Sequence, residues 1–149
     1  MIKFKKVEKN DKDLIAKIVE IEEKVFGKNG GADYWLIKAF VRYGAIFVLI
    51  LEDEIVSIAE FMQIQGENKL FLYGFLTREE YRGKGYAKEL MKACENELKK
   101  NQIDSILLTV DPKNEIGINL YKKLGYLNIE LLKDEYGEGV DRFLFEKKL

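Results

Sequence analysis

The stretch from Lys69 to Val110 constrains the fold of this chain more than any other part. It begins with "KLFLYGFLT" and ends with "SILLTV", two apolar runs rich in residues that favour strands. Between them, residues 86–100 carry apolar side chains at helical spacing. These are Ala87, Leu90, Met91, Cys94 and Leu98. A strand, a helix and a strand in this order predict a parallel pair of strands joined by a crossover helix.

The rest of the chain supplies further strands and helices on both sides of this crossover. Alternating or apolar β-branched runs predict strands at 2–8, 45–52, 55–64, 126–133 and 141–149. Apolar stripes at helical spacing predict helices at 11–26, 32–43 and 114–126, and Gly27 with "NGG" at 29–31 ends the first of these. We therefore expect an α/β chain with a mixed sheet of about seven strands, antiparallel in its first half, and about four helices.

Composition limits the classes of partner. The chain has 149 residues, so we expect a single domain over 1–149. Its 25 basic and 26 acidic residues give a net charge of -1, which is no basis for binding nucleic acid. No apolar run reaches the ~20 residues of a membrane span, and the first residues do not form a signal peptide. One Cys excludes an internal disulfide. We expect a cytoplasmic monomer or homodimer without a membrane or nucleic-acid partner.

The crossover helix begins at an unusual sequence, "YRGKGYAKEL". The first turn of a helix presents backbone N–H groups without intrahelical acceptors and is the positive end of the helix dipole. Glycines let a ligand approach the backbone, and Arg82 and Lys84 add positive charge. This start predicts a phosphate or pyrophosphate site. The spacing fits neither a Walker A loop nor a dinucleotide fingerprint, since Arg78 and Lys88 stand where those motifs need glycine.

The segment Arg82-Gly83-Lys84-Gly85-Tyr86-Ala87 fits the pattern Arg/Gln-x-x-Gly-x-Gly/Ala. Together with the next strand and "NEIGINLYKKLGY", it resembles the GNAT superfamily of acetyl-CoA-dependent N-acetyltransferases, best over residues 52–133. The resemblance implies a GNAT-like acyl-CoA N-acyltransferase fold, acetyl-CoA as co-substrate, no metal, and direct attack by a bound amine. The acceptor stays open between a small molecule and a protein. A non-catalytic CoA-binding sensor or interaction module of the same fold is the alternative.

The resemblance also implies where acetyl-CoA binds. The pyrophosphate would lie on Arg82, Gly83, Lys84, Gly85, Tyr86, Ala87 and Lys88. The pantetheine arm would hydrogen-bond backbone groups of Phe75, Leu76 and Thr77, beside a bulge that Gly74 marks. Gly74 is equally explained as a glycine beneath an aromatic neighbour. Asn114 is an N-cap of the next helix, a polar contact to the ligands, or both. Gly117 would allow close approach of the cofactor.

Two residues are candidates for proton transfer. Tyr121 lies on the apolar face of its helix, which is typical of a core tyrosine, and it matches the tyrosine with which the family protonates the departing thiolate. A phenol of pKa ~10 suits that role. Glu60 shares a strand face with Val56, Ile58 and Met62, so it is either a carboxyl of raised pKa that serves as general base or a residue on a partly wet face.

Five other residues also bear on the assignment of roles. There is no His in the chain, so carboxylates are the first candidates for the base, and Asp111 is the second after Glu60. Family members that acetylate ribosomal protein N-termini carry Glu five residues before the conserved Asn, where this chain has Thr109, and this difference argues against that substrate class. Cys94 and the pair Tyr34 and Trp35 are expected to pack in the core.

Overall fold

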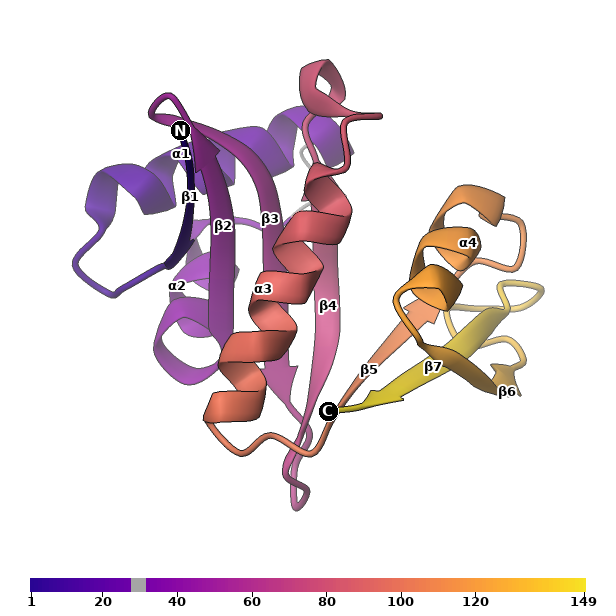
Figure 1. The fold of residues 1–149 in the computed structure, drawn as a ribbon. Coiled ribbons are helices and arrows are strands. Elements are labelled where there is room, and N and C mark those ends of the chain that lie inside the picture. The colour runs from indigo at the N-terminus through magenta and orange to yellow at the C-terminus, as the bar shows by residue number, and fades with distance from the viewer. Residues whose placement is uncertain (28–31) are drawn as a thin grey trace. The chain divides into compact units, whose positions relative to one another are not determined.

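The computed structural model describes residues 1–27 and 32–149, and within them it contains the predicted order of strands and helices (Figure 1). The elements are β1 (Ile2–Lys6), α1 (Lys12–Phe26), α2 (Tyr34–Tyr43), β2 (Ala45–Leu51), β3 (Glu54–Gln63), β4 (Lys69–Thr77), α3 (Tyr86–Lys100), β5 (Ser105–Val110), α4 (Glu115–Lys123), β6 (Leu127–Leu132) and β7 (Arg142–Lys148). A 3-10 turn over Glu79–Tyr81 was not predicted. The turn expected at 29–31 lies outside the described residues.

The strands form one sheet in the order β1-β2-β3-β4-β5-β7-β6. β1, β2 and β3 pair antiparallel, which confirms the predicted antiparallel first half. β4 and β5 pair parallel, with Lys69 opposite Ser105, so the predicted crossover through α3 is confirmed. β7 lies between β5 and β6 and pairs antiparallel with both. The α/β class and the mixed seven-stranded sheet expected from the sequence are therefore confirmed.

Two compact units make up the chain. The first consists of Met1–Met62 with Tyr73–Cys94, and the second of Gln63–Leu72 with Glu95–Leu149. The boundary falls inside β4 and inside α3, so each unit contains part of both elements, and it also separates Gln63 from the rest of β3. The single domain over 1–149 stays a prediction. Each unit is described by itself below.

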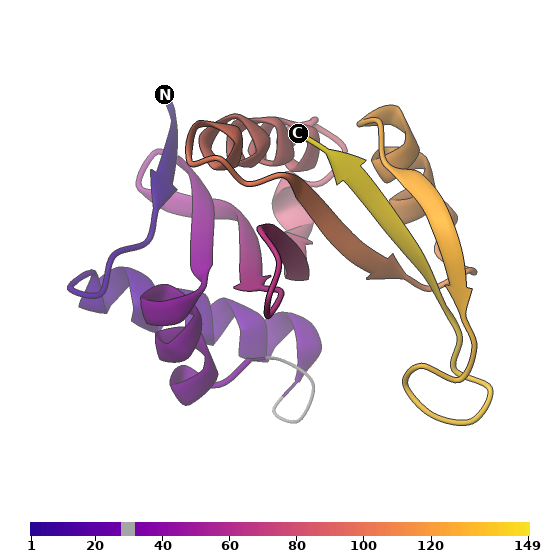
Figure 2. The ribbon, with the colours of Figure 1, turned by 90° about the horizontal axis from the view of Figure 1, so that it is seen from below.

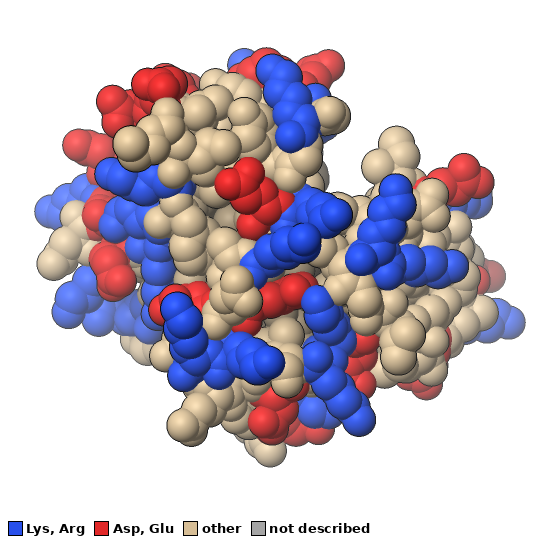
Figure 3. All heavy atoms as spheres, viewed as in Figure 1, with Lys and Arg blue, Asp and Glu red and all other residues tan. Residues whose placement is uncertain are grey.

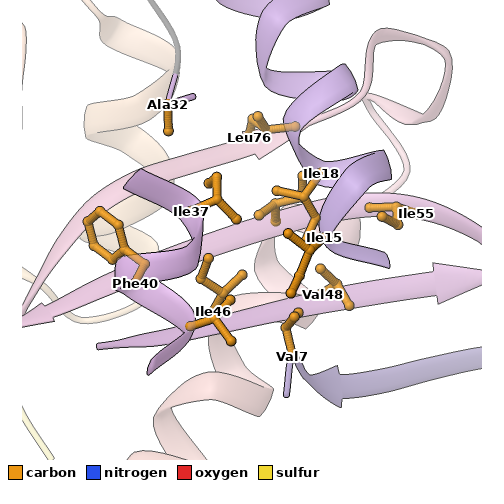
Figure 4. Close-up of a cluster of buried hydrophobic side chains, with 12 residues drawn as sticks. Val7, Ile15, Ile18, Ala32, Ile37, Phe40, Ile46, Val48, Ile55 and Leu76 are labelled. Carbon is orange, nitrogen blue, oxygen red and sulfur yellow. The ribbon is translucent and has the colours of Figure 1, made fainter. Parts of the chain in front are cut away.

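In the first unit, α1 and α2 cover one face of the strands and α3 covers the other (Figures 1 and 2). α1 presents Ile15 and Ile18 to the sheet because they fall one turn apart on its apolar stripe. Figure 4 shows how they meet side chains from α2 and the strands. The cluster consists of Val7, Ile15, Ile18, Ala32, Ile37, Phe40, Val41, Ile46, Val48, Ile55, Ile58 and Leu76.

The second unit is built around β5 and β7. Its fully or nearly buried side chains include Ile106, Leu108, Tyr126 and Phe145. A polar network closes one side of this core: the Tyr126 hydroxyl donates to Glu95 Oε2 at 2.9 Å, and Lys147 Nζ donates to Glu95 Oε1 at 2.8 Å. Because every member has a partner, the buried Glu95 carboxylate is compensated by charge and by hydrogen bonds.

One core assignment from the sequence is confirmed and another is wrong. Cys94 is fully buried, as predicted. Trp35 is 82% exposed and Tyr34 is half exposed, so neither belongs to the core. The reason is the helical phase of α2, whose buried side chains are Ile37, Phe40 and Val41. Trp35 lies in the first turn, away from that stripe.

The core of the first unit gives a direct test of stability. Replacing Ile18 by Ala leaves a cavity under α1, and we expect the free energy of unfolding to fall by about 2–5 kcal/mol. Ile116→Ala is the control, because Ile116 is 86% exposed on α4 and its loss should change stability by less than about 0.5 kcal/mol. Urea unfolding of both variants measures the difference, and equal effects would contradict this packing.

Candidate active site

The turn from β4 into α3 has the conformation that the sequence predicts for a ligand-binding helix start. Gly83 and Gly85 have φ angles of 77° and 83°, in the left-handed region that glycine adopts at low cost. Apart from the adjacent residues, no described residue has an atom within 4 Å of the position of a Cβ atom at either glycine. The first helical hydrogen bond runs from Glu89 N to Gly85 O, so the N–H groups of residues 86–88 belong to the first turn of α3, where N–H groups have no acceptor within the helix.

The turn is fixed at both ends. Arg82 Nε donates to the Thr77 carbonyl at 3.0 Å, which holds the arginine against the end of β4. Arg78 donates to the Ile55 carbonyl at 3.0 Å and pairs with Glu80 at 2.9 Å. These bonds anchor the start of α3, and Arg82 to Lys88 surround that start within the first unit. Arg82, Lys84 and Lys88 are exposed there.

The end of β4 is also ordered by hydrogen bonds. The Ser57 hydroxyl donates to the Leu76 carbonyl at 2.7 Å and lies 3.0 Å from Thr77 Oγ1. The Leu76 side chain belongs to the core cluster, so only its backbone is suited to a ligand contact. Phe75, Leu76 and Thr77 thus lie where the sequence places them, directly before the turn, and Ser57 is the residue that sequence reasoning missed.

Position 74 requires glycine because a side chain from β3 occupies the space where a Cβ atom would lie. A Cβ atom at Gly74 would overlap Glu60 Oε1 and come within 3.1 Å of the carboxyl carbon. Glu60 therefore crosses the backbone of β4 at this position. The interpretation of Gly74 as a glycine beneath an aromatic neighbour is wrong, because the neighbour is a carboxyl group.

Glu60 is buried rather than on a wet face. Its side chain is on the face of β3 that meets α1 and α2, and the residue is 1% exposed. Burial, and then a hydrogen bond and charge repulsion from Glu22 on α1, raise the pKa of Glu60 to about 9. Its Oε2 atom has no hydrogen-bond donor among the described residues. Of the two interpretations made from the sequence, the structure supports a buried Glu60 with a raised pKa rather than a residue on a partly wet face.

In the second unit, Asn114 is the N-cap of α4, as predicted. Its Oδ1 atom accepts from Gly117 N at 3.0 Å. A Cβ atom at Gly117 would lie 2.6 Å from Asn114 Nδ2, so the cap itself accounts for a small residue at that position. Asp111 is exposed, and its Oδ1 atom accepts from Lys113 N at 2.9 Å.

Tyr121 lies on α4 with its ring against two aromatic side chains of the second unit. Its ring centroid is 5.8 Å from that of Tyr126 and 6.4 Å from that of Phe145. Burial raises the pKa of Tyr121 to about 12, so the phenol keeps its proton throughout the neutral range. This packing is compatible with both interpretations made from the sequence, a core tyrosine and a proton donor.

Near the end of β5, Thr109 and Asp111 lie with Tyr136 and Arg142, a grouping that the sequence did not indicate. Thr109 Oγ1 is 3.4 Å from the Tyr136 hydroxyl. The Arg142 guanidinium lies 5.0 Å from the centre of the Tyr136 ring and 3.9 Å from Asp111 Oδ2. They come from β5, the β6–β7 loop and β7, which are distant in sequence, so only the sheet order brings them together.

A cavity lies beside the turn on the surface of the first unit. It has a volume of about 410 Å³ and is lined by Glu20 and Lys24 on α1 and by Arg78, Glu80 and Arg82 of the turn, among others. On the face shown in Figure 3, acidic and basic side chains of this unit are mixed, without a large area of one sign.

Over residues 1–27 and 32–149, no group of three or more His, Cys, Asp and Glu side chains could hold a metal ion. No helix in these ranges is long and apolar enough to cross a membrane.

Comparison with known proteins identifies the family. Residues 15–126 match the acetyltransferase (GNAT) family. An N-alpha-acetyltransferase of Saccharolobus solfataricus is 30% identical over 128 residues, which cover 78% of this chain and 77% of that protein. The chain therefore belongs to the GNAT family. It is an acetyltransferase enzyme, as the sequence predicted.

Solved structures share the fold at low sequence identity. The ribosomal-protein-S18-alanine N-acetyltransferase of Escherichia coli superposes with a TM-score of 0.80 at 18% identity, covering 99% of this chain and 94% of that one. The NatC complex bound to Gag peptide and CoA contains a chain with a TM-score of 0.83 at 15% identity, covering 99% and 98%. These similarities confirm the predicted GNAT-like fold.

The contact between Gly74 and Glu60 gives a test. Gly74→Ala forces the Glu60 carboxyl to move within a packed interior, and we expect stability to fall by about 1–3 kcal/mol. In a Glu60→Ala background the overlap is absent, so the same substitution should cost far less. Urea unfolding of the two single variants and the double variant measures this coupling. A cost for Gly74→Ala that is the same in both backgrounds would contradict the contact.

Proposed function

We propose that this protein transfers an acetyl group from acetyl-CoA to a primary amine by direct attack. The observation that supports this most is the start of α3, where two left-handed glycines and two cations lie within the region that matches the family. The positive end of a helix, with space above its backbone, suits a pyrophosphate. Acetyl-CoA supplies the acetyl group as a thioester. The residues that would hold it are those from Arg82 to Lys88, the backbone of Phe75, Leu76 and Thr77, and Asn114.

Tyr121 is the proposed general acid. Its raised pKa keeps a proton on the phenol at neutral pH, which a donor must have. The hydroxyl gives this proton to the sulfur of the leaving thiol as negative charge develops there. The ring contacts with Tyr126 and Phe145 hold the hydroxyl in one place. No metal has a part in this scheme.

Glu60 is the proposed general base. An amine attacks a thioester only in its neutral form, so a group must take its proton. Glu60 accepts a proton only when it is ionised, and its pKa of about 9 means that this capacity grows as the pH rises through the alkaline range. Asp111 is the alternative, and its exposure makes it the weaker one. Its carboxylate instead holds the turn before α4.

The acceptor is proposed to be the α-amino group of a polypeptide. The support is the relative at 30% identity, which is called an N-alpha-acetyltransferase. Thr109 stands where family members specific for ribosomal protein N-termini carry Glu, so a different carboxylate has to take the proton here, and Glu60 is that residue. We also propose that the protein is cytoplasmic, acts as a monomer or homodimer, and binds neither nucleic acid nor membranes.

The cofactor site is tested at Gly85. Gly85→Asp places a negative charge beside the expected pyrophosphate, and we expect acetyl-CoA affinity to fall at least about tenfold, which is ~1.4 kcal/mol. Gly66→Asp is a matched control, because Gly66 also has a left-handed φ, of 81°, and open space around it. Calorimetry should show normal affinity for the control. A folded Gly85→Asp protein with unchanged affinity would contradict the site.

The acid role is tested by Tyr121→Phe, which keeps the ring and removes the proton. We expect kcat to fall by about 10²–10⁴-fold with acetyl-CoA and acetyl-CoA affinity to change little. An acetyl thioester with a much better leaving group needs no proton, so it should lose far less rate. Tyr43→Phe, at an exposed position on α2, is the control. Turnover of Tyr121→Phe at the normal rate would show that Tyr121 is a core residue.

A further inference from the structure

α1 carries a glutamate in the middle of its apolar stripe. Its buried residues are Ile15, Ile18 and Glu22, all on the side that faces the sheet. Glu22 is 3% exposed, although glutamate is rarely buried without a partner. The carboxyl group that it meets is that of Glu60 on β3, which is 1% exposed. Two acids from different elements thus meet inside the core of the first unit.

No cation balances these two acids. Among the described residues, neither glutamate forms an ion pair with Lys or Arg. Among the elements around Glu60, the titratable side chains of α2 are Tyr34, Lys38, Arg42 and Tyr43, those of β4 are Lys69 and Tyr73, and β2 has none. Lys38 is bonded to the Lys9 carbonyl instead. Glu22 is the charged group that acts on Glu60.

A hydrogen bond between the two carboxyl groups therefore requires that one of them carries a proton. Two ionised carboxylates have only acceptors and repel each other, whereas a carboxyl with a proton donates to its neighbour. Glu60 Oε2 has no other donor among the described residues, and leaving a buried polar atom unsatisfied is costly. A proton on one of the two carboxyl groups removes the repulsion and provides a donor within the pair.

We propose that Glu22 and Glu60 share one proton, and that Glu22 is a positioning residue that holds the Glu60 carboxyl against Gly74 and sets the pH at which Glu60 can accept the proton of the amine. The catalytic part rests on the proposed function. The shared proton does not, because it is argued from the burial of both carboxyl groups, from the missing donor at Glu60 Oε2 and from the interaction between Glu60 and Glu22. Glu22 would then have a role in the reaction without touching the substrate.

The sign of the effect on stability follows from the raised pKa. In the unfolded chain Glu60 loses its proton near its ordinary value of 4.5, whereas in the folded chain it keeps the proton up to about pH 9. Between these values the folded state binds more protons than the unfolded state. Stability conferred by this group is therefore present below pH 4.5 and lost as the pH rises toward 9, with a slope of at most ~1.4 kcal/mol per pH unit.

Carbon-13 NMR of glutamate carboxyl groups tests the pair directly. The resonance that disappears in Glu60→Gln identifies Glu60, and its titration is then followed in the unmodified protein and in Glu22→Gln. Removing the charge of Glu22 and offering an amide donor should lower the titration midpoint of Glu60 by at least about one pH unit. Glu23→Gln is the matched control, because Glu23 is the next residue on α1 and is exposed. A midpoint that Glu22→Gln leaves unchanged would overturn the proposal.

Urea unfolding at pH 5 to 9 gives a second measurement that does not need Glu22→Gln to fold. The unmodified protein should lose stability with rising pH, and Glu60→Gln should lose markedly less. Equal pH dependence in the two proteins would contradict the shared proton.

Activity separates this proposal from the proposed function. If the pair titrates as described, Glu22→Gln should move the rising limb of the kcat profile to lower pH without a matching change in KM. If Glu60→Gln keeps full kcat at every pH, the base role and the positioning role of Glu22 both fail, while the NMR result still decides whether the proton is shared.

Discussion

The turn from β4 into α3 depends on two left-handed residues, Gly83 and Gly85. A side chain at either position would strain the backbone that lets the chain leave a strand and enter a helix within a few residues. The same turn exposes the positive end of α3 and places it next to the end of β4. The geometry that makes the crossover possible therefore also creates the proposed site for acetyl-CoA.

A second constraint comes from the acid inside the first unit. Glu60 is stabilised in a core of isoleucine and valine only because Gly74 leaves room for its carboxyl group and because the group keeps its proton. A hydrophobic residue at position 60 would be the simpler solution for stability. The chain instead contains two buried acids in contact, an arrangement that is typical of functional sites. In the second unit, Glu95 is buried too, but there Lys147 and Tyr126 compensate it fully.

Much of the fold follows from local patterns. β4 and β5 have the bounds that the apolar runs indicated, because each run is interrupted at both ends by polar or turn residues. The position of β7 between β5 and β6 could not be predicted, since it depends on pairing between distant segments. Glu22 was missed although a signal existed: it lies seven residues after Ile15 on an apolar stripe. The neighbour of Gly74 had no such signal, because cross-strand contacts depend on register.

The central claim is that an amine receives the acetyl group of acetyl-CoA. Its most direct test is to incubate the purified protein with acetyl-CoA and two peptides of one sequence, one with a free N-terminus and one with a blocked N-terminus and a lysine. Tandem mass spectrometry locates the acetyl group while thiol release is followed. We predict acetylation of the free α-amino group with one thiol released per acetyl group. Thiol release without any acetylated amine, or no release at all with a panel of such peptides and small amines, would contradict the account.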